Sequence, residues 1–435
     1  MYEHEKETIE LGIIGAGGMG RFYAQTMSKA GWKNVNICDL PEKYESVKKD
    51  FEGTSIRVFP DGYHISRRCD WIMYAVEAEY IDAVVKKFGP ATKIGAIVGG
   101  QTSVKKPEVE ALEKYLPEDV HIISCHSMHG PGVDPKGQPL IVIKHRASDE
   151  KLELVLKILS CFNSNIAHLS AQEHDRITAD TQAVTHAAFL TMGSAWRANA
   201  QFPWLLPHFT GGIENVKVNV ALRIYSNKWH VYAGLAIMNP IANQQITQYA
   251  LSVADLFKLM IQEREDEFRA RVRQAGEFVF GGLQKDHVPI LLDDKILDEF
   301  SLSKIPKEKQ RTPNSHLSLL AMVDCWHKLE LNPYEHLVCQ TPLFRMWMGI
   351  TEYLFRNQAM LDDAIHAALY RKDIRPDDME FVTCARGWAE SVSLGSMEGY
   401  RKRFEETAAF FKDQFAESTV VGNRMIAMIS KNTTK

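Results

Sequence analysis

The sequence lacks the features of several classes of protein. It has no excess of basic residues: Lys and Arg number 51 and Asp and Glu 55, so the net charge is -4 at pH 7. Because nucleic acid and anionic membrane surfaces are held by basic charge, we expect neither as a partner. No run approaches the roughly 18 apolar residues of a membrane span. The opening MYEHEKETIE alternates charges where a secretory signal is apolar, so we expect a cytoplasmic protein.

Paired cysteines are also missing. The seven cysteines are scattered and form no CxxC motif, which argues against both a disulfide framework and a structural zinc site. Cys125, His126 and His129 are close in sequence, but residues so near one another cannot easily point at one tetrahedral centre. We therefore expect reduced thiols and no metal.

The 435 residues suffice for more than one domain, and the texture of the chain changes near residue 165. Before it, short apolar runs alternate with helical stretches, and the candidate strands are 9–15, 35–39, 70–76, 94–100, 121–126 and 139–143. Nearly continuous apolar strands are typical of a parallel sheet covered by helices on both faces. Residues 1–165 are thus predicted to form a doubly wound, Rossmann-type α/β domain that binds a dinucleotide.

Residues 166–435 are predicted to form an all-α domain. Helical periodicity fills 171–200, 242–280 and 316–329. The stretch 281–313 has little periodicity and scattered Lys, Asp and Pro, so we expect a loop insertion there. We expect the helical domain to bind substrate and to form the dimer contact.

A glycine-rich loop follows the first apolar strand and opens a helix. Gly15, Gly17 and Gly20 form a GxGxxG motif, in which the glycines permit a tight turn, close approach of a pyrophosphate, and close packing of helix on strand. The helix N-terminus adds amide hydrogens and partial positive charge. The alternative is a purely structural glycine turn. The residues predicted to bind the cofactor here are Gly15, Ala16, Gly17, Gly18, Met19 and Gly20.

Asp39 ends the second candidate strand, 19 residues after Gly20 (39 − 20 = 19). An acidic side chain at this place usually accepts hydrogen bonds from the ribose hydroxyls and favours NAD. The alternative is a solvated loop charge. From the residues alone, Asp39 therefore indicates NAD.

Two loops at predicted strand ends concentrate polar groups, Ser103 in one and His126 in the other. In an open α/β sheet the ligand binds outside the carboxyl ends of the strands. A histidine there can accept a proton near neutral pH, and a neighbouring hydroxyl can orient it. His126 is thus a candidate catalytic base, with a structural histidine as the alternative.

The helical half carries polar residues in apolar surroundings. Gln182 and His186 are four residues apart on one helix face, with Asp175 and Thr178 further back, which indicates either a pocket wall or satisfied core polarity. Arg223 lies in strongly apolar sequence, where an unpaired cation is costly. It either meets a buried carboxylate or is kept for an anionic ligand, which would be a carboxylate.

Together these motifs resemble the prephenate dehydrogenases of the fungal type, and the resemblance covers nearly the whole chain. It rests on GIIGAGGMG, VGGQTSVK, HSMHGP, EHDRITADTQAVTHAAF and LRIYSNKWHVYAGLAIMNP, which are specific in combination and order. One departure is Ser127, where many relatives have proline.

The resemblance implies an oxidoreductase of tyrosine biosynthesis that converts prephenate to 4-hydroxyphenylpyruvate. It implies that His126 takes the proton of the 4-hydroxyl, Ser103 fixes that hydroxyl, and Arg223 grips a substrate carboxylate. His186 and Gln182 match polar positions of the substrate pocket. A homodimer is also implied, for which the apolar helix TPLFRMWMGITEYLF is a candidate surface.

Three alternatives remain open at this point. The resemblance implies NADP, whereas Asp39 indicates NAD; we favour NADP because the match spans the chain. An arogenate dehydrogenase would differ in substrate by an amine in place of the keto group. A noncatalytic dinucleotide sensor would not need Ser103, His126 and Arg223 together, so their joint presence argues against it.

Overall fold

The computed structural model describes residues 3–207, 209, 211–282, 289, 297, 298, 300–302, 312–335 and 342–431. The chain divides into two compact units, Met1–Thr178 and Ala179–Lys435, which are treated separately below. The division falls later than residue 165, the boundary expected from sequence. The reason is that strand β8 (Asn165–His168) pairs with β7, and helix α8 (Ala171–Thr178) packs on β7 and α6 of the first unit.

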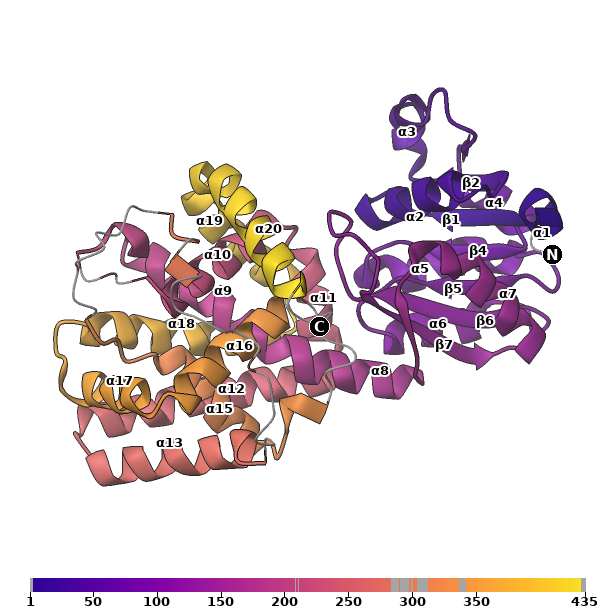
Figure 1. Ribbon diagram of the computed structural model, residues 1–435. Helices are drawn as coiled ribbons and strands as arrows, with labels where there is room; N and C mark the ends of the chain where they lie inside the picture. Colours follow the sequence, from indigo (N-terminus) through magenta and orange to yellow (C-terminus); the bar gives the residue numbers. More distant parts are fainter. Residues whose placement is uncertain are drawn as a thin grey trace. The chain divides into compact units, whose positions relative to one another are not determined.

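The first unit is built on one eight-stranded sheet in the order β3-β2-β1-β4-β5-β6-β7-β8 (Figure 1). Neighbouring strands are parallel except β6 and β7, which are antiparallel. All six expected strands are confirmed; the two additional ones, β3 and β8, are short edge strands without an apolar run. The other bounds are β1 Glu10–Ile14, β2 Asn34–Cys38, β3 Arg57–Phe59, β4 Trp71–Tyr74, β5 Ile97–Gly100, β6 His121–Ser127 and β7 Pro139–Arg146.

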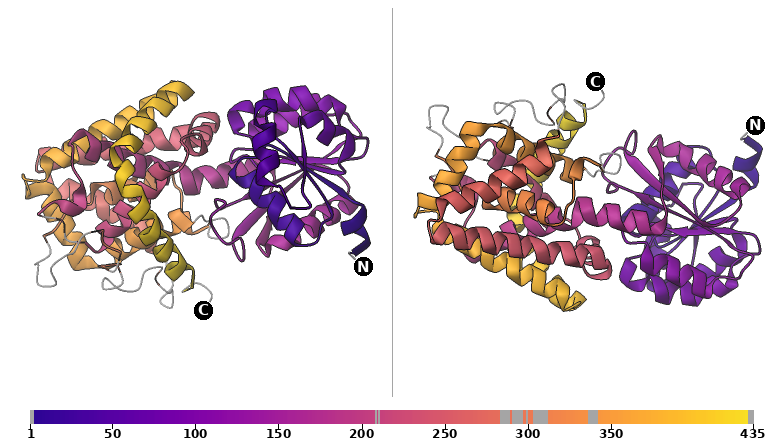
Figure 2. Two further views of the ribbon diagram at one scale, coloured as in Figure 1. Left: turned by 90° about the horizontal axis from the view of Figure 1, so that it is seen from above. Right: turned by 90° about the horizontal axis from the view of Figure 1, so that it is seen from below.

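Helices cover both faces of this sheet (Figure 2). Successive strand residues point to opposite faces, so Ile13 packs in one buried cluster with α2 and α7, and Ile14 in another with α4, α5 and α6. The predicted doubly wound α/β fold is confirmed. The helices are α1 Glu3–Thr8, α2 Gly18–Lys29, α3 Tyr44–Asp50, α4 Gly62–Arg68, α5 Ile81–Phe88, α6 Lys106–Tyr115 and α7 Asp149–Leu159, with short 3-10 turns at Pro41–Lys43, Ala78–Tyr80, Gly89–Ala91 and Ser160–Phe162.

The second unit is helical in its described residues, as predicted. Its long helices are α9 Val184–Ala198, α10 Ile213–Ser226, α11 His230–Met238, α12 Pro240–Ile261, α13 Glu265–Phe280, α15 Leu317–Lys328, α16 Pro342–Arg356, α17 Gln358–Tyr370, α18 Arg375–Ser393, α19 Met397–Phe411 and α20 Phe415–Lys431. Two 3-10 turns lie at Pro203–Leu205 and Lys412–Gln414. Most of the insertion expected at 281–313 lies outside the described residues.

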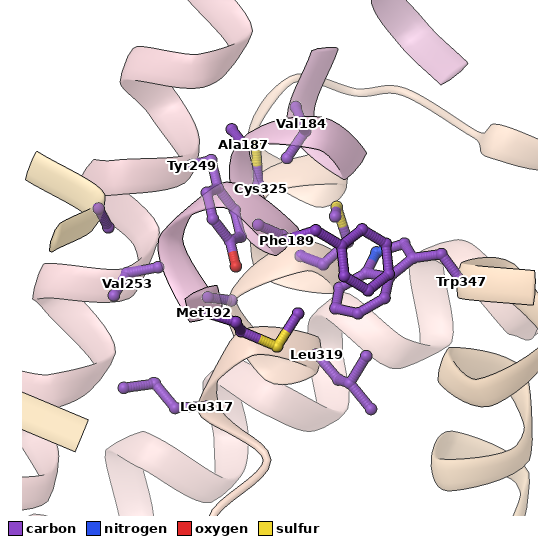
Figure 3. Close-up of a cluster of buried hydrophobic side chains, with 14 of the residues drawn as sticks. Val184, Ala187, Phe189, Met192, Tyr249, Val253, Leu317, Leu319, Cys325 and Trp347 are labelled. Carbon is purple, nitrogen blue, oxygen red and sulfur yellow. The ribbon is translucent and has the colours of Figure 1, made fainter. Parts of the chain in front are cut away.

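One apolar core holds these helices together. Figure 3 shows Phe189 of α9 against Trp347 of α16, with ring centroids 4.5 Å apart, and Tyr249 and Leu319 belong to the same cluster. The large apolar side chains of α16 from Phe344 to Leu354 are therefore used inside the protomer. Among its described side chains, α16 presents no free apolar face, so the sequence-based argument that this helix supplies the dimer surface was wrong.

The helix expected over 171–200 is interrupted. Between α8 and α9 the five residues Ala179–Ala183 form a π-helix, which begins where the second unit begins. A π-turn shifts the register of the side chains that follow it, and such turns are frequent at functional sites. Gln182 lies inside this turn and His186 just after it. Among the described helices, none is long and apolar enough to cross a membrane.

Candidate functional site

The glycine loop has one crowded side and one open side. Gly15 has φ +111°, and a Cβ added there would lie 2.4 Å from the carbonyl oxygen of Ala75; one added at Gly20 would lie 1.9 Å from the carbonyl oxygen of Gly15. A Cβ at Gly17 would meet nothing within 4 Å. Gly17 is the N-cap of α2 and supplies no side chain to cap it. The open side thus presents the amide end of a 12-residue helix, which fits a diphosphate.

Asp39 lies beside this loop and is hydrogen-bonded to it. Its Oδ2 accepts a hydrogen bond from the Ala16 amide at 2.9 Å, and its Oδ1 accepts one from the Leu40 amide at 2.7 Å. The Lys43 ammonium lies 3.4 Å from Oδ1. Asp39 therefore holds the glycine loop in shape, a task that the spacing argument did not predict. Its expected contact with a ribose remains a prediction.

A buried ion pair lies beneath the loop that follows β5. Lys105 and Glu108 are fully buried, and the Lys105 ammonium lies 3.0 Å from Glu108 Oε2. The same ammonium donates to the carbonyl oxygens of Gly100 and Cys125 at 3.2 and 2.9 Å, and to Ser124 Oγ at 3.1 Å. One cation thus joins the ends of β5 and β6 to the first turn of α6.

Glu108 completes the arrangement from the other side. It accepts hydrogen bonds from the amide and the hydroxyl of Thr102, at 3.1 and 2.5 Å. A Cβ added at Gly100 would lie 2.3 Å from Glu108 Oε2, so glycine at that position leaves room for the carboxylate. The sequence argument missed this pair because Lys and Glu three apart at a helix start usually form a solvated pair.

Ser103 lies in the same loop and is half-buried. In the part of the chain that the structure describes, no hydrogen bond joins Ser103 to His126. The partner that the structure gives to His126 is another residue, His174.

His126 stands at the end of β6 and begins a chain of hydrogen bonds. Its Nδ1 lies 2.8 Å from Nε2 of His174, and Nδ1 of His174 lies 2.9 Å from Oδ1 of Asp175. Asp175 in turn accepts hydrogen bonds from the backbone amides of Lys105 and Lys106 at 2.6 and 2.8 Å. Asp175 therefore caps α6, whereas the sequence argument set it behind a pocket wall. His174 lies within the Glu-His-Asp run of the family motif, but the sequence argument gave it no task.

Burial controls the charge of both histidines. It is the largest influence on His126, whose pKa it places well below the ordinary value, and the positive charges of His174, Lys105 and His129 act in the same direction. Burial also lowers the pKa of His174, against the opposing hydrogen bond to Asp175. Both rings are neutral at pH 7, so His126 is in the form that can accept a proton.

The histidine loop and the glycine loop belong to one edge of the sheet. The hydroxyl of Tyr23, on α2, lies 2.6 Å from the hydroxyl of Ser127, directly after His126. A Cβ added at Gly18 would lie 3.1 Å from Cγ of Pro131. Proline at position 127 has no hydroxyl and could not bond to Tyr23. The departure from the family pattern at Ser127 therefore has a structural task.

In the second unit, Gln182 and His186 are buried with polar atoms left over. Gln182 Nε2 and His186 Nδ1 have no hydrogen-bond partner among the described residues. Burial lowers the pKa of His186 to about 3, so its ring is neutral. The ring of Tyr232 stands edge-on to it at 4.8 Å, and both line a small, mainly apolar cavity. Unsatisfied buried polar atoms beside a cavity favour the pocket-wall interpretation over satisfied core polarity.

Arg223 is half-buried on α10, and its Nη1 donates to Oδ1 of Asn423 at 2.7 Å. Within the described residues it forms no ion pair, so the expected alternative of a buried carboxylate partner is not seen there. Burial lowers the pKa of Arg223, and nearby Tyr232 opposes this shift. Tyr232, which the sequence argument did not single out, thus lies near both Arg223 and His186. No group of His, Cys, Asp or Glu in the described part of the chain could hold a metal ion.

An open glycine loop at a helix N-terminus, a buried neutral histidine on the same sheet edge, and a helical second unit define a two-domain nucleotide-dependent dehydrogenase architecture. Residues 183–431 match a family model described as a 6-phosphogluconate dehydrogenase C-terminal domain. Residues 10–98 match the model described as NADP oxidoreductase, coenzyme F420-dependent.

Curated relatives carry the comparison further. The chain is 57% identical to the probable prephenate dehydrogenase [NADP(+)] of Schizosaccharomyces pombe, over 99% of this chain and 100% of that protein. It is 49% identical to the prephenate dehydrogenase [NADP(+)] of Saccharomyces cerevisiae, over 98% of this chain and 95% of that protein. A probable arogenate/prephenate dehydrogenase of Methanocaldococcus jannaschii is 22% identical over 52% of this chain and 51% of that protein. The chain belongs to the prephenate dehydrogenase family of the two fungal proteins, which confirms the resemblance.

The ion pair yields a stability prediction. Lys105→Met removes the cation and leaves Glu108 buried with an uncompensated charge, which costs about 3–5 kcal/mol. We expect a lower urea midpoint, with hydrogen exchange accelerated in peptides covering 97–115.

The control removes both charges. In Lys105→Met combined with Glu108→Leu, no charge is left unpaired, so most of the lost stability should return. If Lys105→Met alone were as stable as the unmodified protein, the pair would not hold the strand ends together.

Proposed function

We propose that this protein is a prephenate dehydrogenase that converts prephenate to 4-hydroxyphenylpyruvate and CO2 in tyrosine biosynthesis, with NADP as cofactor, in the cytoplasm. The observation that carries the proposal is the buried neutral His126 on the sheet edge that also bears the open glycine loop. Its occurrence in a chain 57% identical to a fungal protein of that name supports the substrate class.

The residues of the glycine loop fit the cofactor. The backbone from Gly15 to Gly20 and the first turn of α2 would hold the diphosphate, since the Gly17 side is open. When bound, NADP would supply the acceptor for the hydride that leaves C4 of prephenate. Asp39 already accepts two backbone hydrogen bonds and has Lys43 beside it, which suits a 2′-phosphate better than an acidic site open to ribose alone.

His126 acts as the base in this proposal. Its Nδ1 is engaged by His174, so Nε2 is the atom that accepts the proton of the 4-hydroxyl as the hydride departs. The bond between C1 and the ring carboxylate then breaks, CO2 leaves, and its electron pair completes the aromatic ring. We propose that Ser103 hydrogen-bonds the same hydroxyl.

Arg223, His186 and Gln182 are the proposed substrate-binding residues of the helical unit. Among the described residues, Arg223 has a neutral partner, Asn423, and no anionic one, so its guanidinium is available to a carboxylate. The unsatisfied nitrogens of Gln182 and His186 suit polar groups of the substrate. Prephenate has two carboxylates, and a neutral His186 does not repel or attract them by charge.

The two loop glycines yield a prediction about cofactor binding. Gly17→Ala places a methyl group where the diphosphate approaches, so the affinity for NADPH should fall about tenfold or more while the thermal midpoint stays unchanged. Gly20→Ala should lower the midpoint itself, because its Cβ collides with the backbone at Gly15. Fluorescence titration and thermal unfolding measure the two effects. Unchanged NADPH affinity in Gly17→Ala would place the diphosphate elsewhere.

A kinetic pair tests the function. The unmodified protein should produce reduced nicotinamide absorbance with prephenate, faster with NADP than with NAD. His126→Asn should lower kcat by roughly 10²-fold or more with KM nearly retained. Arg223→Ala should raise KM for prephenate while NADP affinity holds, because it removes only a carboxylate contact.

The same assay separates the alternatives. Activity with arogenate and none with prephenate would make the protein an arogenate dehydrogenase. No activity with either would leave the dinucleotide sensor. Wild-type kcat in His126→Asn would show that another group is the base, and circular dichroism of each variant controls for folding.

The family resemblance also supports a homodimer, with a contact surface other than α16. Light scattering at micromolar concentration should then give about 2 × 49.4 = 98.8 kDa. A mass near 49.4 kDa would contradict the dimer.

A further inference from the structure

The hydrogen-bonded chain behind His126 has no role in the mechanism above. It runs from His126 through His174 to Asp175, all within the first unit, and ends on the first turn of α6. His174 is fully buried, so it is not placed to meet a substrate from solvent.

The donors along this chain can be assigned from its far end. Asp175 accepts the amide hydrogens of Lys105 and Lys106, and a carboxylate can only accept, so Nδ1 of His174 must carry the hydrogen between them. His174 is neutral because burial lowers its pKa. Its Nε2 therefore has a lone pair and accepts a hydrogen bond from Nδ1 of His126. The remaining nitrogen of His126, Nε2, then has the free lone pair.

We infer that His174 and Asp175 are positioning residues that hold His126 in the tautomer with hydrogen on Nδ1, so that Nε2 is the base. The inference rests on the proposed function for its catalytic meaning, whereas the tautomer is a property of the protein alone. An aspartate that fixes the tautomer of a catalytic histidine has the same logic. Here a second imidazole extends that logic by one link.

The chain also compensates the charge that His126 gains. When Nε2 takes a proton, the Nδ1 hydrogen bond to His174 strengthens, and the Asp175 carboxylate lies one ring further away. The other charged or titratable groups that act on these rings are Lys105, Glu108 and His129. Because Lys105 is paired with Glu108, Asp175 is the anion linked to His126 through hydrogen bonds.

The test changes the middle link. His174→Phe keeps an aromatic ring but removes the acceptor, whereas His174→Gln keeps an acceptor oxygen at similar reach. Imidazole 15N shifts of His126, assigned by comparison with His126→Asn, should show the Nδ1-H tautomer in the unmodified protein and in His174→Gln. His174→Phe should show a mixture of tautomers. This readout needs neither substrate nor turnover.

Kinetics supply the second readout. His174→Phe should lower kcat roughly 10–10²-fold with KM for prephenate unchanged. Losing the acceptor makes the protonated His126 less stable, so the acid limb of kcat/KM, which reports protonation of the base, should move to lower pH. His174→Gln should recover most of kcat and shift the limb less.

The outer link has a matched control. Asp175→Asn should give mixed tautomers and reduced kcat, because an amide can also donate. Ser148→Ala removes a comparable cap from α7, where Ser148 Oγ accepts from the Lys151 amide at 3.4 Å. It should lower thermal stability without altering the tautomer or the acid limb.

The outcomes separate the inference from the proposed function. An unmodified His126 with hydrogen on Nε2, or a His174→Phe variant with wild-type tautomer and pH profile, would overturn the inference. Absence of turnover with prephenate in a protein that shows the Nδ1-H tautomer would instead overturn the proposed function. NADPH binding confirms that each variant is folded, and Asp175→Asn decides the tautomer question if His174→Phe does not fold.

Discussion

The candidate site depends on where Lys105 lies. Its ammonium holds the carbonyl oxygens at the ends of β5 and β6 together, and its own backbone amide binds Asp175. One residue therefore fixes both the strand that carries His126 and the chain of hydrogen bonds behind that histidine. Such an ammonium is costly to bury, and Glu108 makes it tolerable by supplying the opposite charge and two further acceptor contacts.

The cofactor side follows the same principle with a weaker charge. Asp39 turns its carboxylate toward the Ala16 amide and so braces the loop that the diphosphate must approach. The loop then keeps its open side at Gly17 without help from a ligand. In both places an ionised side chain satisfies backbone groups at the carboxyl end of a strand, where regular sheet hydrogen bonds have ended.

Residue patterns predicted most of the fold because the signals are local. Continuous apolar strands, the glycines after β1 and the long helical periodicity each lie within one segment, and the six main strands and the two-part architecture followed from them. The short strand β8 and the break at Ala179–Ala183 were missed, since an exposed four-residue strand and a π-turn leave no periodic signature. The site was predicted less completely because it depends on contacts between distant segments. His174 lies 48 residues from its partner His126, and Asp175 lies 70 from Lys105, so no spacing rule connects them.

The same ion pair also sets the electrostatic conditions for a base. Burial disfavours charge on His126, and the Lys105 cation adds to that effect. With Lys105 unpaired, protonation of His126 would put two cations in one desolvated site. Glu108 cancels the first of them, and Asp175 offers a negative charge through His174 to the second. A neutral base that can still become cationic thus requires two carboxylates arranged behind it. The near balance of charges over the whole chain is consistent with electrostatics that act through such placed pairs rather than through bulk charge.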